Sequence, residues 1–165
     1  MQEQESNREE EEYYNAMIEA FIDKDEKTQW YQNAFKKFNV NGVDTMKWHW
    51  SWWAFGGGAG FLLYRKQYLY AFILFFSSFI LGAIPFVTFI IMILSGGYAT
   101  YFIYKGFKNK LAEIEAKIED KEKRIETMRE VGGYHTWVIW VYALLSLFMF
   151  ATLITMLNVT MNTPL

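Results

Sequence analysis

The stretch YLYAFILFFSSFILGAIPFVTFIIMILSGGYATYFIY, Tyr68 to Tyr104, decides the fold. Its 37 residues carry no charge, and one helix of that length would extend about 55 Å, nearly twice the hydrocarbon thickness of a bilayer. The chain must therefore turn inside the stretch. LGAIPF predicts the turn, because Gly82 can leave helical geometry and Pro85 cannot donate within a helix. The sequence predicts a transmembrane hairpin over residues 68–104, with spans near 68–83 and 86–104.

A second uncharged tract runs from Tyr134 to Leu165. Within it, residues 137–157 have the length of one more span, opened by Trp137 and Trp140, and residues 158–165 form a short tail. Hydrophobic residues make up 53% of the chain and are segregated from the charged ones. We therefore expect an all-α membrane protein with three transmembrane helices, one interfacial or re-entrant helix, and cytoplasmic amphipathic helices.

The segment WHWSWWAFGGGAGFLLY, residues 48–64, is the aromatic and glycine-rich part of the chain. Its tryptophans suit the headgroup level, and its uncharged length is at the lower limit of a span. The glycines weaken a helix by up to about 1 kcal/mol each relative to alanine. An interfacial or re-entrant helix is therefore favoured, and a full span stays open.

The N-terminal region divides at residue 13. Residues 1–12 are rich in glutamate and predict an acidic disordered tail, with a docking patch for a basic partner as the alternative. Residues 13–47 show helical spacing of apolar side chains, interrupted by DKDEKT and ended by the turn signal NVNG at 39–42. This pattern predicts two short cytoplasmic amphipathic helices.

Residues 105–133 are densely charged and predict one cytoplasmic helix that ends at Gly132. Apolar residues in it step by four and three, which is the spacing of a heptad seam. Two arrangements would cover this seam: packing on residues 13–38 of the same chain, or a coiled-coil contact with a copy or a partner. The candidate interface residues are Leu111, Ile114, Ile118 and Ile125.

Basic residues mark the cytoplasmic side of a membrane protein and lie at both ends of the predicted hairpin. They are also candidates for contact with anionic lipid headgroups. This predicts a cytoplasmic loop over 105–135, a cytoplasmic N-terminus and an external C-terminus. The residues concerned are Arg65, Lys66, Lys105, Lys108 and Lys110.

The residue content argues against several function classes. There is no cysteine, and the two histidines, His49 and His135, lack the spacing of a metal motif. The predicted spans hold no charged residue, which argues against pumps and ion-coupled transporters. The net charge of −2 gives no reason to expect nucleic-acid binding. No catalytic residue, metal site or cofactor is expected.

The segment WWAFGGGAGFLLYRKQY resembles a family of small bacterial membrane proteins, domain of unknown function 2628. The Tyr-Arg-Lys block at 64–66 is its specific motif, and FIDK at 21–24 and the closing Gly132-Gly133 are similar too. Ala59 stands where the family usually has proline, and Gly56 and Gly57 stand where it has phenylalanine. The resemblance covers roughly residues 20–133. It implies a bacterial inner-membrane protein and no activity.

These observations lead to an expected function without catalysis. We expect a scaffold or accessory subunit that presents cytoplasmic helices. An oligomeric channel or a lipid-handling protein is the alternative, and a membrane enzyme comes third. The expected partners are the lipid bilayer, possible anionic lipids, and a second copy or another membrane protein.

Overall fold

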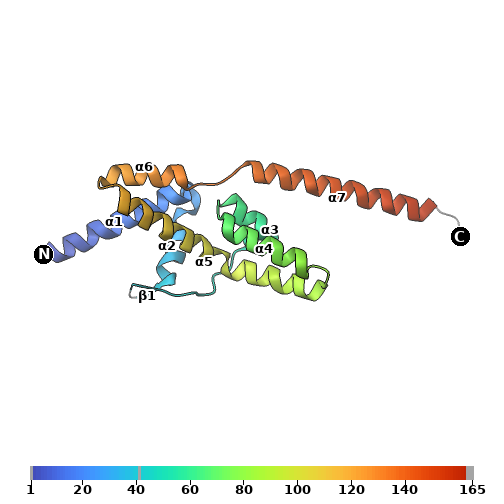
Figure 1. Ribbon diagram of the computed structural model, residues 1–165, viewed down its shortest axis with the longest axis horizontal. Helices are drawn as coiled ribbons and strands as arrows, with labels where there is room; N and C mark the ends of the chain where they lie inside the picture. The colour runs from blue at the N-terminus through green and yellow to red at the C-terminus, as the bar shows by residue number, and fades with distance from the viewer. Residues whose placement is uncertain (1, 41, 163–165) are drawn as a thin grey trace. The chain divides into compact units, whose positions relative to one another are not determined.

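The computed structural model describes residues 2–40 and 42–162, and these residues are mostly helical (Figure 1). They divide into two compact units, Met1–Tyr134 and His135–Leu165. The elements in chain order are α1 (Gln2–Ile22), α2 (Asp25–Phe38), β1 (Asn39–Val40), β2 (Val43–Asp44), α3 (Trp52–Tyr64), α4 (Tyr68–Leu81), α5 (Pro85–Lys117), α6 (Lys121–Val131) and α7 (Trp137–Asn162).

The first helix begins earlier than the sequence predicts. Residues 1–12 were expected to be a disordered tail, and this prediction is wrong for residues 2–12, which form the first half of α1 and are exposed from Gln4 to Glu12. Glutamate is a good helix former, and its charge is favourable near a helix N-terminus. An ion pair one turn apart, between Arg8 Nε and Glu12 Oε1 at 3.3 Å, also suits a helix.

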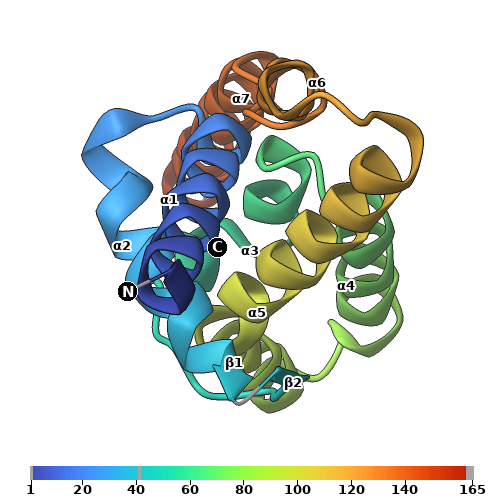
Figure 2. The ribbon, with the colours of Figure 1, turned by 90° about the vertical axis from the view of Figure 1, so that its left-hand side faces the viewer.

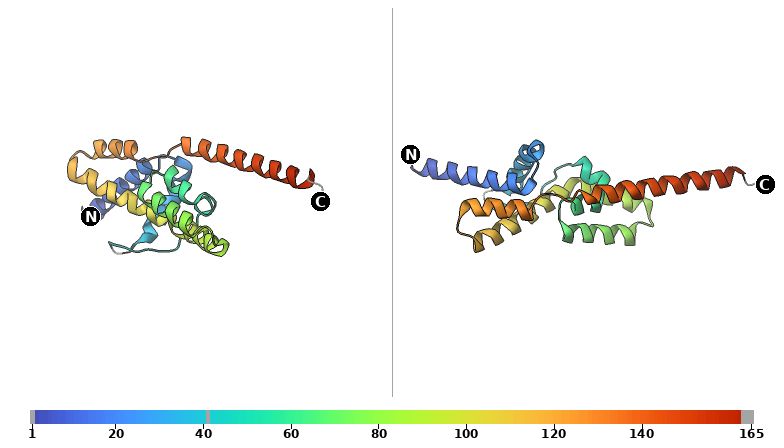
Figure 3. Two further views of the ribbon diagram at one scale, coloured as in Figure 1. Left: turned by 45° about the vertical axis from the view of Figure 1, so that its right-hand side comes forward. Right: turned by 90° about the horizontal axis from the view of Figure 1, so that it is seen from above.

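The first unit contains an aromatic core built by α1, α2, α6 and the part of α5 from Tyr104 to Lys117, together called the head. α1 and α6 lie side by side (Figures 1 and 3). Phe107 of α5 is fully buried, and its ring lies 5.4 Å from those of Phe21 of α1 and Phe35 of α2. The two amphipathic helices therefore cover α5, and the predicted break between them falls at Asp23 and Lys24.

The charged segment is two helices rather than one. α5 runs without interruption from the apolar hairpin into the charged region and ends at Lys117, and α6 then turns back. Ile118 has an extended backbone, and the Asp120 side chain accepts a hydrogen bond from the Lys123 N–H and caps α6. The prediction of a single helix over 105–133 is therefore wrong, because an N-cap interrupts the seam.

The predicted hairpin turn is in the expected place. α4 ends at Leu81 and α5 begins at Pro85, and Gly82 follows directly after α4. A Cβ at Gly82 would lie 2.3 Å from the Ser78 carbonyl oxygen, which explains the glycine. Figure 2 shows α4 on one side of α5 and the pair α1 and α2 on the other.

The aromatic segment before α3 crosses α5 in an extended conformation. His49 and Ser51 donate their N–H groups to the carbonyls of Gly97 and Gly96 at 2.9 and 2.8 Å. α3 then packs against α4 and α5. Its helix is broken at Gly58, whose φ of 49° is a conformation that favours glycine.

Two helices of the described residues are long and apolar enough to cross a membrane: Phe86–Lys117 and Trp137–Met156. The apolar helix α4, Tyr68–Leu81, is shorter. The all-α class is confirmed, and the third span stays a prediction. In the second unit, α7 includes residues 158–162 of the expected tail, and residues 163–165 lie outside the described part.

Candidate functional site

The described residues contain no cluster of three or more histidine, cysteine or acidic side chains that could hold a metal ion. His49 is packed against the rings of Trp30 and Phe38. Its burial, reinforced by nearby Lys37, lowers the pKa of the imidazole. We interpret His49 as part of the aromatic packing and not as a metal ligand.

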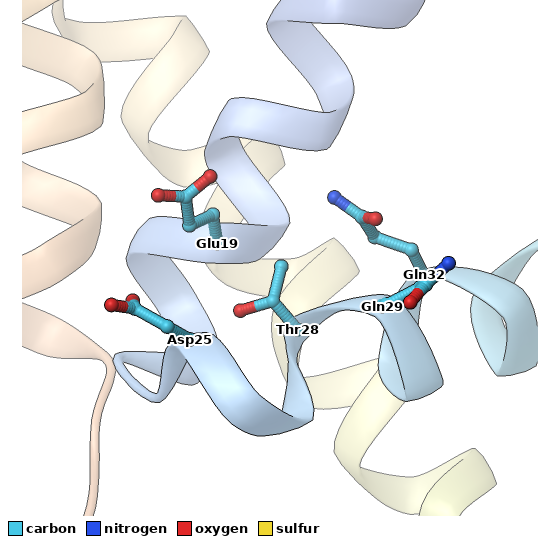
Figure 4. A pocket seen from close by; sticks show the side chains of 5 residues that line it. All are labelled: Glu19, Asp25, Thr28, Gln29 and Gln32. Atoms are coloured by element: carbon cyan, nitrogen blue, oxygen red, sulfur yellow. The ribbon is translucent and has the colours of Figure 1, made fainter.

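An open hollow lies between α1 and α2, lined by Glu19, Asp25, Thr28, Gln29 and Gln32 (Figure 4). Its side chains are carboxylates, amides and one hydroxyl. The Thr28 hydroxyl donates to the carbonyl of Lys24, as is common near a helix start. The carboxylates of Glu19 and Asp25 could act as bases, but the Thr28 hydroxyl is directed to the Lys24 carbonyl and not to either of them, so the geometry does not activate it as a nucleophile.

The most distinctive site is a meeting of three turns, each with one residue in the left-handed backbone region. These residues are Asp23 between α1 and α2, Lys66 between α3 and α4, and Gly133 after α6, with φ of 50°, 57° and 72°. A Cβ at Gly133 would lie 3.4 Å from Asp23 Oδ2 and 3.9 Å from Lys66 Nζ. We call residues 21–24, 64–67 and 131–134 the three-turn junction. This conformation is ordinary for Gly133 but uncommon for Asp23 and Lys66, and two such residues close together mark a candidate functional site.

The junction supplies the hydrogen bonds that the end of α1 lacks. The last carbonyls of a helix have no partner within it. The Gly133 N–H donates to the Phe21 carbonyl at 2.8 Å, and Arg65 Nη1 donates to the Ile22 carbonyl at 3.0 Å. A Cβ at Gly132 would lie 2.7 Å from the Phe21 oxygen, so this close approach requires glycine.

Arg65 is buried within the junction and is only 5% exposed. Its Nε donates to the Tyr31 hydroxyl at 3.2 Å, and its guanidinium lies 4.7 Å from the centroid of that ring. The prediction that Arg65 contacts lipid headgroups is therefore wrong. Charge in a sequence suggests a surface residue, but this guanidinium is held by a helix C-terminus and an aromatic ring.

Three lysines of the described residues also converge on the junction. Lys24 Nζ donates to the Tyr64 hydroxyl at 3.0 Å and lies 4.6 Å from the centroid of the Tyr134 ring. Lys110 Nζ donates to the Val131 carbonyl. Lys66 has its ammonium group beside Gly133, as described above. Lys66 and Lys110 were predicted from the basic clusters, whereas Lys24 was missed because it lies over 40 residues before the nearer cluster.

The other two predicted basic residues belong to a different place. Lys105 Nζ pairs with Asp44 Oδ2 at 3.0 Å, and the fully buried Tyr104 donates its hydroxyl to Asp44 Oδ1. The hydrogen bond from Tyr104, and then the lysine, hold the pKa of Asp44 below its usual value, with Lys108 adding a weaker attraction. The five predicted cations are therefore divided between the junction and the β-hairpin.

The candidate interface residues on the heptad seam are inside the first unit. Leu111 and Ile114 are each 6% exposed in the same core as α1 and α2, and Ile118 and Ile125 pack against that core. The structure thus has the first of the two predicted arrangements, packing within the same chain, and α1 and α2 cover the surface that a coiled-coil contact with a copy or a partner would use. The break before α6 folds the seam on itself and lets α1 cover both halves.

Comparison with family models, with curated proteins and with solved structures finds no match to this chain.

Proposed function

We propose that this chain is a non-enzymatic integral membrane protein, a scaffold or accessory subunit that presents the head at the cytoplasmic face. One observation carries the proposal: large apolar side chains are exposed on α4 and the first half of α5, whereas the head is closed. Phe79 and Phe86 are 77% and 71% exposed, while Phe35 and Phe107 of the head are fully buried. Lipid is the solvent that would cover such a surface at low cost.

The proposed location is a bacterial inner membrane, with the N-terminus cytoplasmic and the C-terminus external. The resemblance to domain of unknown function 2628 supports the bacterial membrane. The basic residues before α4 and after the apolar half of α5 support the orientation. In this arrangement α4, the first half of α5 and α7 are the three spans, and α3 is a re-entrant helix. The break at Gly58 and the covering of α3 by α4 and α5 are compatible with a helix that does not cross.

The head surface offers charge rather than an apolar groove for a partner. The seam residues are covered, and the first half of α1 is an exposed acidic helix with Glu9, Glu10, Glu11 and Glu12. A basic segment of a membrane-protein partner fits this surface. Because the seam is covered within the chain, the partner-binding part of the proposal rests on this acidic helix.

The test has a topological and a biochemical part. Reporter fusions after Glu130 should report cytoplasmic and those after Leu165 external, and an external signal at Glu130 would contradict the orientation. Purification in mild detergent with mass spectrometry should retain a partner protein. Replacing the four consecutive glutamates by glutamine should release it, and the same change at Glu113, Glu115, Glu119 and Glu122 serves as the matched control. A symmetric oligomer that retains only lipid would instead favour a channel or a lipid-handling protein.

A further inference from the structure

The three-turn junction carries more positive charge than its own carboxylates neutralise. Arg65, Lys24, Lys66 and Lys110 converge there, and none of them belongs to an ion pair within 4.0 Å among the described residues. Within residues 21–24, 64–67 and 131–134 the one carboxylate is that of Asp23, and Asp25 and Glu130 directly flank these residues in the chain. Lys24, Arg65 and Lys66 against Asp23 leave two positive charges within the junction, and the ammonium group of Lys110 adds to them. Like charges repel one another unless an anion lies between them.

The two predicted lysines of the junction also affect one another. Lys110 lies beyond the apolar part of α5, with its ammonium 5.4 Å from the centroid of the Phe21 ring. Burial lowers the pKa of Lys110, and the charge of Lys66 lowers it further. A bound anion would relieve both effects because it would replace lost hydration and lie close to both ammonium groups.

The junction lies at the level where apolar segments begin. Its residues 64–67 directly precede the apolar helix α4, and its last residue, Tyr134, comes three positions before α7. Tyr64 and Tyr134 are in contact, with ring centroids 5.2 Å apart. Tyrosine is enriched at the headgroup level of a membrane, where its ring is apolar and its hydroxyl is wet. Under the proposed orientation, the lipid headgroups that face the junction are those of the cytoplasmic leaflet.

From these observations we propose that the three-turn junction binds a phosphate group, that of an anionic phospholipid headgroup, through Lys24, Lys66 and Lys110. Lysine ammonium groups suit this role because they are mobile point charges with three donors each. Arg65 is buried and adds positive charge to the site without contacting the lipid, since its Nε and Nη1 groups donate to Tyr31 and Ile22. The lipid source of the phosphate rests on the proposed membrane function, whereas recognition of phosphate does not.

Titration of the full chain in detergent with dioctanoyl phosphatidylglycerol, and separately with dioctanoyl phosphatidylcholine, tests the proposal. The test variant is Lys66→Asn with Lys110→Gln, because asparagine tolerates the left-handed backbone at position 66 and glutamine can still donate to Val131. The matched control is Lys105→Gln with Lys108→Gln, which removes the same charge from the Asp44 site. Surface lysines contribute about a fivefold change in affinity each, so the test variant should bind phosphatidylglycerol about 25-fold more weakly.

The control pair should leave phosphatidylglycerol affinity unchanged, and neither variant should alter the weaker binding of phosphatidylcholine. Equal losses in both variants would overturn the site in favour of diffuse surface charge, as would equal binding of the two lipids. Lys66→Arg with Lys110→Arg should restore binding and shows that the loss is one of charge rather than folding. Binding of inorganic phosphate without binding of phosphatidylglycerol would overturn the lipid source. Extraction of the native chain from membranes by alkaline carbonate would instead contradict the membrane function, with soluble lipid binding still measurable.

Discussion

Replacing Arg65 by methionine would test whether a buried cation without a carboxylate holds the first unit together. Methionine has a similar reach and no charge, so it fills the space and removes the donors. The Ile22 carbonyl at the end of α1 would lose the hydrogen bond from Nη1, and the Tyr31 ring and hydroxyl would lose the guanidinium. Each of these partners lies in the head, whereas Arg65 belongs to the turn before α4.

The magnitude follows from the two contacts. A hydrogen bond from a charged donor contributes about 1.5–3 kcal/mol, and a cation over an aromatic ring about 0.5–2 kcal/mol. Removing a buried charge also removes its desolvation cost, which offsets part of the loss. The expected decrease in the free energy of unfolding is about 2–3 kcal/mol, equivalent to a fall in melting temperature of about 5–10 °C for a chain of this size.

Thermal unfolding in detergent, followed by far-ultraviolet circular dichroism, measures this change, and a double-mutant cycle assigns it. Tyr31→Phe keeps the ring and removes only the hydroxyl, and it should cost about 1 kcal/mol. Combined with Arg65→Met, the two changes should be less than additive by 0.5 kcal/mol or more, on the order seen for residues in contact. Lys66→Asn, one residue away, is the control and should leave the melting temperature unchanged.

An unchanged melting temperature for Arg65→Met would refute the reasoning. It would mean that the contacts of Arg65 with the Ile22 carbonyl and with Tyr31 contribute nothing to the free energy of unfolding. Strict additivity in the cycle would refute the assignment of the loss to the contact with Tyr31. A lower melting temperature for Lys66→Asn equal to that of Arg65→Met would indicate that the turn backbone, and not the guanidinium, is the sensitive feature.

Four further changes have defined outcomes. Gly97→Ala would place its Cβ 2.4 Å from the Trp48 ring and should lower the melting temperature. Gly56 has open space around it, so Gly56→Ala should leave the free energy of unfolding equal or raise it by up to about 1 kcal/mol. Ile114→Asp would bury a carboxylate and should destabilise the chain by about 3 kcal/mol or more without changing its size in detergent. Dissociation of an oligomer by this variant would show instead that the seam is shared between copies. The pKa of Asp44 is lowered in the folded chain, so its carboxylate contributes to the free energy of unfolding above the unfolded pKa. This contribution is lost as the pH falls through the folded pKa. The difference in melting temperature between Asp44→Asn and the native chain should therefore shrink below about pH 4.

The features that the sequence predicts well are those with a local signal. The turn before Pro85 is such a case, because proline and glycine act on their own backbone and the apolar length on either side limits where the turn can lie. The break at Asp23 is another, since a run of charged residues separates two apolar faces. For the end of the charged helix at Gly132, the glycine itself is the signal.

The three-turn junction could not be predicted because its parts are distant in the sequence. Positions 23, 66 and 133 come together only after α5 and α6 have folded back on α1. Arg65 next to Lys66 looks like an ordinary basic stop, and only tertiary packing reveals that one is buried and the other is not. The error at Asp120 has a different origin: a capping aspartate was present, but the regular apolar spacing on both sides favoured a continuous helix.

The same turn that holds Arg65 also joins the head to the apolar hairpin. Gln67 is buried, its Nε2 donates to the Arg65 carbonyl at 3.2 Å, and a Cβ at Gly106 would lie 1.9 Å from its Oε1. The turn before α4 is therefore packed directly on α5 just beyond its apolar half, while α5 itself continues unbroken into the head. A displacement of the head by a partner would consequently act on α5 and on this turn together, since neither can move without losing the Gln67 contact. Because the proposed phosphate-binding lysines flank this connection, lipid bound there would stabilise the head in its position on the hairpin.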